Sequence, residues 1–183
     1  MVVPEASRDF EIPEGVSLDL IGRTLTVNGP KGSLTREFPD KDVAIDISDD
    51  TLTIKTHFPA KKKVALLGMY GGRIRNMLRG VTTGFRARLK IVSSHFPITL
   101  EVRDDQVLIN NFLGERHPRK ARIHEGAEVS VEGEFVSIVG IDKDAVAQTA
   151  ANIEQGTVIR GRDRRIFQDG IYLVEKTHLM EEL

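Results

Sequence analysis

The sequence predicts an α+β protein made of two tandem homologous small domains, each an antiparallel sheet with a helix packed on one face. Two observations carry this prediction. Short alternating strands precede a helix twice, in the same order and about 80 residues apart. Hydrophobic residues make up 40% of the 183 residues, which is enough to form packed cores. An offset of this length is too long for a solenoid unit and suits a duplicated domain.

The first domain begins with strands and tight turns. A strand at residues 25–28 leads into a Gly-Pro-Lys-Gly turn. Two alternating runs, at residues 43–48 and 51–54, form a hairpin that turns at Asp49 and Asp50. The Gly-Pro-Lys-Gly run lacks the Lys-Ser/Thr ending and the following helix of a phosphate-binding loop, so we interpret it as a turn between strands.

A helix completes the first domain, which is predicted to span residues 1–82. The helix runs from about Ala60 to Leu78, because apolar side chains recur near one face over this stretch. Gly80 and Gly84 interrupt the helical pattern and mark the domain boundary. The residues predicted to face the core are Val64, Leu67, Ile74, Met77 and Val81.

The second domain, residues 83–176, repeats this order. Its first strand, at residues 85–92, alternates apolar and mostly basic side chains, so one face is expected to be buried. A strand at residues 107–110 leads into a turn, and residues 129–131 and 135–139 form the next hairpin. This second run through the same order of elements is the reason to predict a duplication.

The helix of the second domain starts at Asp142, a residue suited to an N-cap, and ends near Gly156. Its core-facing residues are predicted to be Val146, Thr149, Ala150 and Ile153. An alternating strand at residues 171–174 follows an arginine-rich loop. Residues 177–183 form a polar C-terminal tail without a clear pattern, and we expect it to fray.

Charge is segregated along the chain, although the net charge is only -1. From residue 51 to residue 100 there are ten Lys and Arg and not one Asp or Glu. Local patches, and not the net charge, set the field that a polyanion meets at contact. The pattern therefore favours a nucleic-acid partner, with basic residues on ordinary solvated faces as the alternative.

Two basic segments of the second domain are the candidate RNA-binding sites. One is predicted as a loop around Pro118, and the other joins the helix to the last strand. Arginine suits such a site, because its planar fork of donors pairs two phosphate oxygens at once. We expect the segments to converge on one RNA surface, with polar contacts from the adjoining helix. The candidate residues are Arg116, His117, Arg119, Lys120, Arg122, Gln148, Asn152, Arg160, Arg162, Arg164 and Arg165.

The helix of the first domain carries a second basic group, which could contact RNA, a protein or only water. These residues are Lys61, Lys62, Lys63, Arg73, Arg75 and Asn76. The same helix contains Gly68, Gly71 and Gly72, each of which costs about 1 kcal/mol relative to Ala. Close approach of another backbone, from the domain's own sheet or from RNA, would explain them.

No catalytic, metal or cofactor site is predicted. The five His residues lack the spacing of a metal site, and the His-Phe-Pro triplets at His57 and His95 are interpreted as a coincidence. No carboxylate stands in an apolar context that would suit acid–base chemistry. We therefore expect neither an enzyme nor a small-molecule substrate. The 8 Phe and 2 Tyr occupy core-like positions, so phosphate and shape recognition is expected in place of base stacking.

Composition also bears on the compartment. The chain contains no Cys, and no apolar run approaches the roughly 18 residues that span a bilayer. The N-terminal residues include acids and Pro where a signal peptide has a basic start and an apolar run. We expect a soluble cytosolic protein without a membrane partner.

Three runs of the sequence resemble the large-subunit ribosomal protein L-six family, in its archaeal/eukaryotic branch. They are residues 29–34, residues 111–115 (Asn-Phe-Leu-Gly-Glu) and residues 148–176. The third run is the most specific, and it lacks the Lys-Gly-Lys-Gly-Ile-Arg-Tyr type of ending that is typical of the bacterial branch. The likeness extends from about Glu11 to Lys176.

The resemblance implies a structural constituent of the large ribosomal subunit, located in cytoplasmic ribosomes and without catalysis or a cofactor. It implies binding of large-subunit rRNA, mainly through the second domain, at the sarcin–ricin region and neighbouring helices, where translation GTPases dock. The implied protein neighbours are ribosomal proteins at the stalk base, and a homo-oligomer is not expected. Two other interpretations stay open: a non-ribosomal RNA-binding or assembly protein, and a protein–protein interaction module with an acidic partner.

Overall fold

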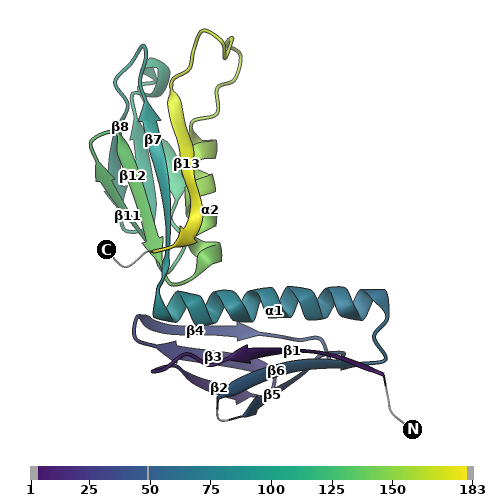
Figure 1. Ribbon diagram of the computed structural model, residues 1–183. Coiled ribbons are helices and arrows are strands. Elements are labelled where there is room, and N and C mark those ends of the chain that lie inside the picture. Colours follow the sequence, from purple (N-terminus) through teal and green to yellow (C-terminus); the bar gives the residue numbers. More distant parts are fainter. Residues whose placement is uncertain (1–3, 49, 181–183) are drawn as a thin grey trace. The chain divides into compact units, whose positions relative to one another are not determined.

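The computed structural model describes residues 4–48 and 50–180 and divides the chain into two compact units, residues 1–83 and 84–183. Each unit contains one long helix and antiparallel strands (Figure 1). The predicted α+β class is confirmed. Each unit builds two antiparallel sheets, where the sequence suggested one. No helix in the described ranges is long and apolar enough to cross a membrane.

In the first unit, two three-stranded sheets and a helix enclose the core. The sheets have the orders β1-β6-β5 and β2-β3-β4. The elements are β1 (Glu5–Glu11), β2 (Ser17–Ile21), β3 (Thr24–Gly29), β4 (Gly32–Glu37), β5 (Ala44–Ser48), β6 (Thr51–His57) and α1 (Lys61–Thr82). Of the turn predicted at Asp49 and Asp50, Asp49 lies outside the described residues.

The Gly-Pro-Lys-Gly run is a tight turn between β3 and β4, as predicted. Gly29 pairs with Gly32 across the hairpin, and the Lys31 N–H donates to the Val81 carbonyl at 2.9 Å. A Cβ atom on Gly29 would lie 2.6 Å from the Val81 side chain. The turn thus sits directly against the C-terminal end of α1, which explains the glycine at position 29.

Helix α1 begins where predicted, but it runs past its predicted end and one of its predicted core residues is exposed. Leu67, Ile74, Met77 and Val81 are buried as expected, but Val64 is 43% exposed, because the buried stripe of the helix begins only at Leu67. The helix also continues through the buried Gly80 to Thr82, since packing of Val81 outweighs the low helix propensity of glycine.

The second unit combines a four-stranded sheet, a three-stranded sheet and a helix. The sheets have the orders β11-β12-β7-β13 and β10-β9-β8. The elements are β7 (Phe85–Val92), β8 (Thr99–Arg103), β9 (Gln106–Asn110), the 3₁₀ turn η1 (Phe112–Gly114), β10 (Arg119–Arg122), β11 (Ala127–Glu132), β12 (Phe135–Gly140), α2 (Lys143–Gly156) and β13 (Gly170–Leu179).

Helix α2 matches its prediction closely. The Asp142 carboxylate caps it by accepting the Asp144 N–H at 3.0 Å. All four predicted core residues, Val146, Thr149, Ala150 and Ile153, are buried. Val146, Ala150 and Ile153 pack in one cluster with the apolar face of β7, which includes Ala87 and Leu89. The helix runs alongside β13 (Figure 1).

Two predictions about strands of the second unit are wrong. The stretch predicted as a loop up to Arg122 ends in strand β10, which pairs with β9 from Arg119 onward. The predicted tail is strand from Thr177 to Leu179, because β13 continues there beside β7. Two irregularities in the β7–β13 register break the alternation of side chains and so conceal this strand in the sequence. The last predicted tail residues, 181–183, lie outside the described ranges.

Candidate nucleic-acid interface

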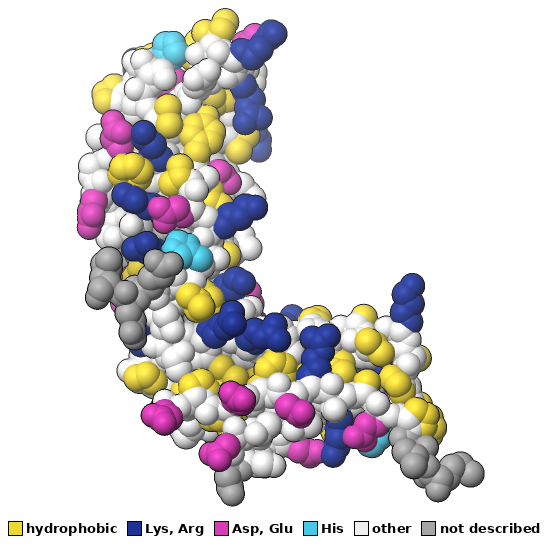
Figure 2. Space-filling model, in the orientation of Figure 1, with side chains coloured by type: hydrophobic (Ala, Val, Ile, Leu, Met, Phe, Trp, Pro, Cys, Tyr) yellow, Lys and Arg dark blue, Asp and Glu magenta, His cyan; other side chains and the backbone are white. Residues whose placement is uncertain are grey.

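Two segments of the second unit carry the candidate RNA-binding side chains. We call residues 115–122 the basic segment and residues 157–169, between α2 and β13, the arginine loop. Figure 2 shows Lys and Arg side chains gathered where Figure 1 draws the arginine loop. Which of these side chains are available to a ligand depends on their contacts within the protein.

Arg119 ties the two segments together. Its Nε and Nη2 atoms donate to the Glu115 carboxylate at 2.8 and 2.6 Å. Its Nη1 atom donates to the carbonyls of Gly156 and Val158, at 3.0 and 3.1 Å, where the arginine loop begins. The guanidinium also lies 4.3 Å from the ring centroid of Phe112. Arg119 is therefore committed to contacts within the protein.

The lowered pKa of Glu115 also shows that the basic segment and the arginine loop lie close together. Hydrogen bonds from Arg119 hold the pKa of Glu115 below its ordinary value, and the positive charge of Arg162 acts in the same direction. Arg162 belongs to the arginine loop, so its charge reaches the basic segment. The structure thus brings together the two segments that the sequence expected to converge.

The arginine loop is ordered by a turn around Asp163. The Asp163 carboxylate accepts the Arg165 N–H at 2.9 Å and pairs with the Arg165 guanidinium at 2.9 Å. The Asp163 carbonyl accepts N–H groups from Ile166 and Phe167 at 3.1 and 2.9 Å. Hydrogen bonding to Arg165 lowers the pKa of Asp163 and correspondingly raises the pKa of Arg165. Arg165 is thus partly committed to this turn.

Other basic side chains of the two segments are exposed and have no partner within the described part of the chain. Such side chains can meet a phosphate without first losing a protein contact, so they are the best candidates for the interface. They are Arg116, His117, Lys120, Arg122, Arg160 and Arg164.

Gln148 and Asn152 lie next to the basic segment on α2. The Gln148 amide donates to the Asn152 side-chain oxygen at 3.1 Å, and the Asn152 amide donates to the Arg122 carbonyl at 2.9 Å. Asn152 thus joins α2 to β10, whereas Gln148 is exposed. Of the two predicted polar contacts, Gln148 is the more accessible to a ligand.

The basic group of the first unit is partly committed as well. Figure 2 shows Lys and Arg side chains along α1. Lys63 pairs with Asp42 at 3.0 Å, and the Arg75 guanidinium lies 5.7 Å from the Phe10 ring centroid. Lys61 and Lys62 are exposed and unpaired among the residues that are described. Arg73 is exposed, and Asn76 is half-buried.

Of Gly68, Gly71 and Gly72 in α1, only Gly71 has a packing reason in the first unit. A Cβ atom there would lie 3.0 Å from the Phe10 ring on β1. At Gly68 the nearest atom would be 3.9 Å away, and at Gly72 a Cβ would meet nothing within 4 Å. The unit's own sheet therefore explains the glycine at position 71, where the Phe10 side chain on β1 leaves little room for a Cβ atom.

Sequence reasoning missed a buried carboxylate at the end of the arginine loop. Asp169 is fully buried and accepts the N–H groups of Ser94 and His95, each at 2.8 Å. Its other oxygen lies 2.7 Å from Nδ1 of His95. Burial raises the pKa of Asp169, but the hydrogen bonds from His95 and its neighbours outweigh burial and lower the pKa to about 2. No local pattern signals this contact, because the partners are more than 70 residues apart in the sequence.

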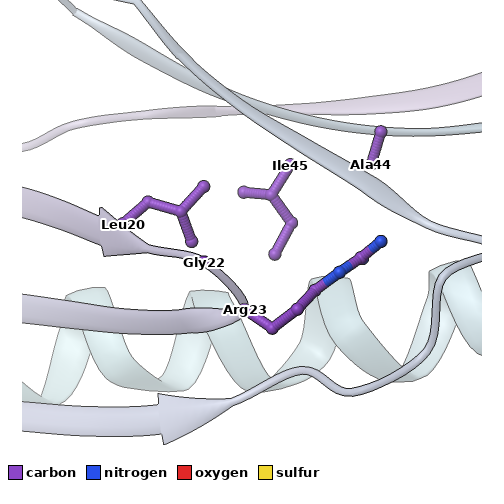
Figure 3. Close-up of a pocket in the computed structure, with 5 residues that line it drawn as sticks. All are labelled: Leu20, Gly22, Arg23, Ala44 and Ile45. Atoms are coloured by element: carbon purple, nitrogen blue, oxygen red, sulfur yellow. The ribbon is translucent and has the colours of Figure 1, made fainter.

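The hollow between β2 and β5 in the first unit offers no convincing small-molecule site. It has a volume of about 240 Å³ and is lined by Leu20, Gly22, Arg23, Ala44 and Ile45 (Figure 3). The Arg23 guanidinium donates to the carbonyls of Asp40 and Val43, at 2.9 and 2.7 Å, so its charge is already partnered. The described residues contain no cluster of His, Cys, Asp and Glu that could hold a metal ion.

Three archaeal proteins are similar to this chain over nearly its whole length. The chain is 49% identical over 177 residues to the large ribosomal subunit protein uL6 of Methanobrevibacter smithii, covering 96% of this chain and 99% of that protein. It is 49% identical to uL6 of Methanothrix thermoacetophila over 175 residues, with 96% and 99% covered. It is 46% identical to uL6 of Aeropyrum pernix over 167 residues, with 91% and 92% covered.

The model of the family Ribosomal protein L6 matches residues 12–84 and 96–170, one match in each unit. The two matches agree with the repeated order of elements in the sequence. The family and the archaeal relatives confirm the resemblance seen in the sequence, and they agree with a ribosomal, cytoplasmic and non-enzymatic protein. The chain belongs to the ribosomal protein L6 family.

Proposed function

We propose that the protein is a structural constituent of the large ribosomal subunit that binds large-subunit rRNA mainly through its second unit. Recognition is of phosphates and RNA shape. The observation that supports this is the set of exposed, unpartnered basic side chains on two segments that Arg119 holds together. The proposed location is the sarcin–ricin region and neighbouring helices, near the site where translation factors bind.

Salt-dependent binding to purified large-subunit rRNA tests this proposal. Each phosphate contact lowers log K by roughly 0.7 to 0.9 per unit of log salt concentration. Replacing Arg160 and Arg164 together by Ala removes two unpartnered cations and should reduce the slope by roughly 1.4 to 1.8. Arg103→Ala is the matched control, because Arg103 is an exposed cation on β8 of the same unit and outside both segments. Equal slopes for both variants would reject this assignment.

For the first unit, we infer contact with a neighbouring ribosomal protein. Val64 and Met69 are each 43% exposed on the N-terminal half of α1, near the unpaired Lys61 and Lys62. Exposed apolar side chains next to flexible lysines suit a protein neighbour better than an RNA backbone, which offers them no apolar partner. Lysine-reactive cross-linking of intact large subunits would identify the neighbour of Lys61 and Lys62. Links only to proteins far from the stalk base would contradict the proposed placement.

A further inference from the structure

We propose that the segment at residues 94–97, which joins β7 to β8, is a positioning element that holds the basic segment and the arginine loop in one arrangement before RNA binds. This inference rests on the proposed RNA-binding function. The segment contains the His-Phe-Pro triplet that begins at His95, which was interpreted as a coincidence from the sequence alone. It contacts structures on both sides of the candidate interface.

On one side, the segment fixes the end of the arginine loop through Asp169. The Asp169 carboxylate is fully buried and accepts two short backbone hydrogen bonds from the segment, with a third from Phe96 at 3.4 Å. The His95 ring adds the 2.7 Å contact through Nδ1. Because the carboxylate is ionised at neutral pH, Nδ1 of His95 donates the proton in this bond.

The contact continues from His95 to an arginine. The His95 ring packs on the Phe167 ring, with centroids 4.9 Å apart and an interplanar angle of 34°. The Arg162 guanidinium lies 4.8 Å from the centroid of the same Phe167 ring. A chain of direct contacts therefore runs from buried Asp169 through His95 and Phe167 to a candidate RNA-binding residue.

On the other side, the segment touches the residues that lead into the basic segment. A Cβ atom on Gly114 would lie 3.1 Å from the Phe96 ring, so that ring packs on the bare backbone there. The Asn111 side chain donates to the Pro97 carbonyl at 3.0 Å. Asn111 and Gly114 both have positive φ, at 58° and 78°, so this turn adopts a conformation that such contacts help to hold.

The contacts of the 94–97 segment restrain the arginine loop and are not needed to build the apolar core. Residues 160–165 are exposed throughout. Before them the loop is held by Arg119 and by buried Ile159, and after them by Asp169 and by the Tyr172 hydroxyl, which donates to the Gln168 carbonyl at 3.0 Å. Releasing the end of the loop should let its arginines move while the apolar core cluster stays packed, because neither Asp169 nor His95 belongs to that cluster. A positioning role thus predicts loop mobility without loss of the fold.

Limited trypsin digestion of the full chain without RNA tests this directly, since trypsin cleaves after the four arginines of the loop. We compare His95→Ala, Asp169→Asn and His95→Asn, whose amide can replace the Nδ1 donor to Asp169. His57→Ala is the matched control, because His57 begins the other His-Phe-Pro triplet, and the one contact of its side chain within the described residues is an exposed 3.4 Å contact with Glu5. Thermal unfolding of each variant is measured in parallel.

We expect cleavage within residues 160–165 to accelerate at least about fivefold in His95→Ala and Asp169→Asn, and to return toward the wild-type rate in His95→Asn. His57→Ala should match wild type. If Asp169→Asn does not fold, the His95 variants decide the outcome, because the His95 side chain is 38% exposed and its loss is tolerable. Wild-type cleavage rates in His95→Ala would overturn the proposal.

The same variants separate this inference from the proposed function. Faster loop cleavage together with weaker rRNA binding and a reduced salt slope supports both. Faster cleavage in a protein whose wild-type form does not bind rRNA supports the positioning element and rejects the RNA-binding function. Faster cleavage with an unchanged salt slope overturns the inference that the arrangement serves RNA binding.

Discussion

Replacing Arg119 by Ala should destabilise the second unit far more than replacing Arg160 by Ala, because Arg119 makes contacts within the protein and Arg160 has no partner in the described structure. The two bonds to backbone carbonyls involve a charged donor, and such bonds contribute about 1.5 kcal/mol each at the low end of their range. The contact with Phe112 adds about 0.5 to 1 kcal/mol, and the pair with Glu115 about 0 to 1 kcal/mol, because both side chains of that pair are partly exposed. The expected loss is roughly 3.5 to 5 kcal/mol.

Thermal unfolding and rRNA binding, measured on the same preparations, check this expectation. For a unit of this size, 1 kcal/mol corresponds to a shift of about 4 to 8 °C, so the midpoint should fall by more than about 10 °C. Arg160→Ala should leave the midpoint unchanged and reduce the salt slope instead, since its side chain has no partner in the described structure. An unchanged midpoint in Arg119→Ala, with a slope that falls as in Arg160→Ala, would refute the distinction between committed and available arginines.

Three further predictions concern stability. The folded-state pKa of Asp169 is lowered from 3.8 to about 2, so the ionised carboxylate stabilises the folded state fully above about pH 4, and this stabilisation is lost as the pH falls toward 2. Acid titration monitored by circular dichroism should therefore show a loss of about 2 kcal/mol of folding stability in the wild-type protein. The same loss should be absent in Asp169→Asn. Asp142→Ala removes the N-cap of α2 and should cost about 1 kcal/mol in urea unfolding. Gly71→Val should destabilise the first unit by more than about 1 kcal/mol, whereas Gly72→Ala, where a Cβ meets nothing within 4 Å, should stabilise α1 slightly. Equal effects at the two glycines would contradict the packing of Gly71 on Phe10.

The elements with strong local signals could be predicted from the sequence. Helix α2 has a capping aspartate and a regular apolar stripe, and strand β7 alternates cleanly between buried and basic side chains, so both were placed correctly. Strands β1, β2 and β8 were missed, and β10 was taken for a loop. These strands are short or mostly exposed, so their pairing with neighbours, and not their own pattern, holds them in place.

The candidate site could be predicted only as a set of residue types. Both basic segments were recognised, but the sequence could not separate Arg119, which ties the segments together, from Arg160 and Arg164, which have no partner in the described structure. That distinction depends on the carbonyls of Gly156 and Val158, which the fold brings near β10. Asp169 was missed for the same reason, since its partners lie on a distant segment.

The most direct measurement is chemical footprinting of the purified protein on deproteinised large-subunit rRNA, at low and moderate salt. A compact protected region that weakens with salt, and weakens further in the Arg160→Ala/Arg164→Ala variant but not in Arg103→Ala, is the predicted result. Protection within the sarcin–ricin region and its neighbouring helices would support the proposed location. Absence of protection at every salt concentration would contradict RNA binding by the second unit and favour a protein–protein module built on the same fold.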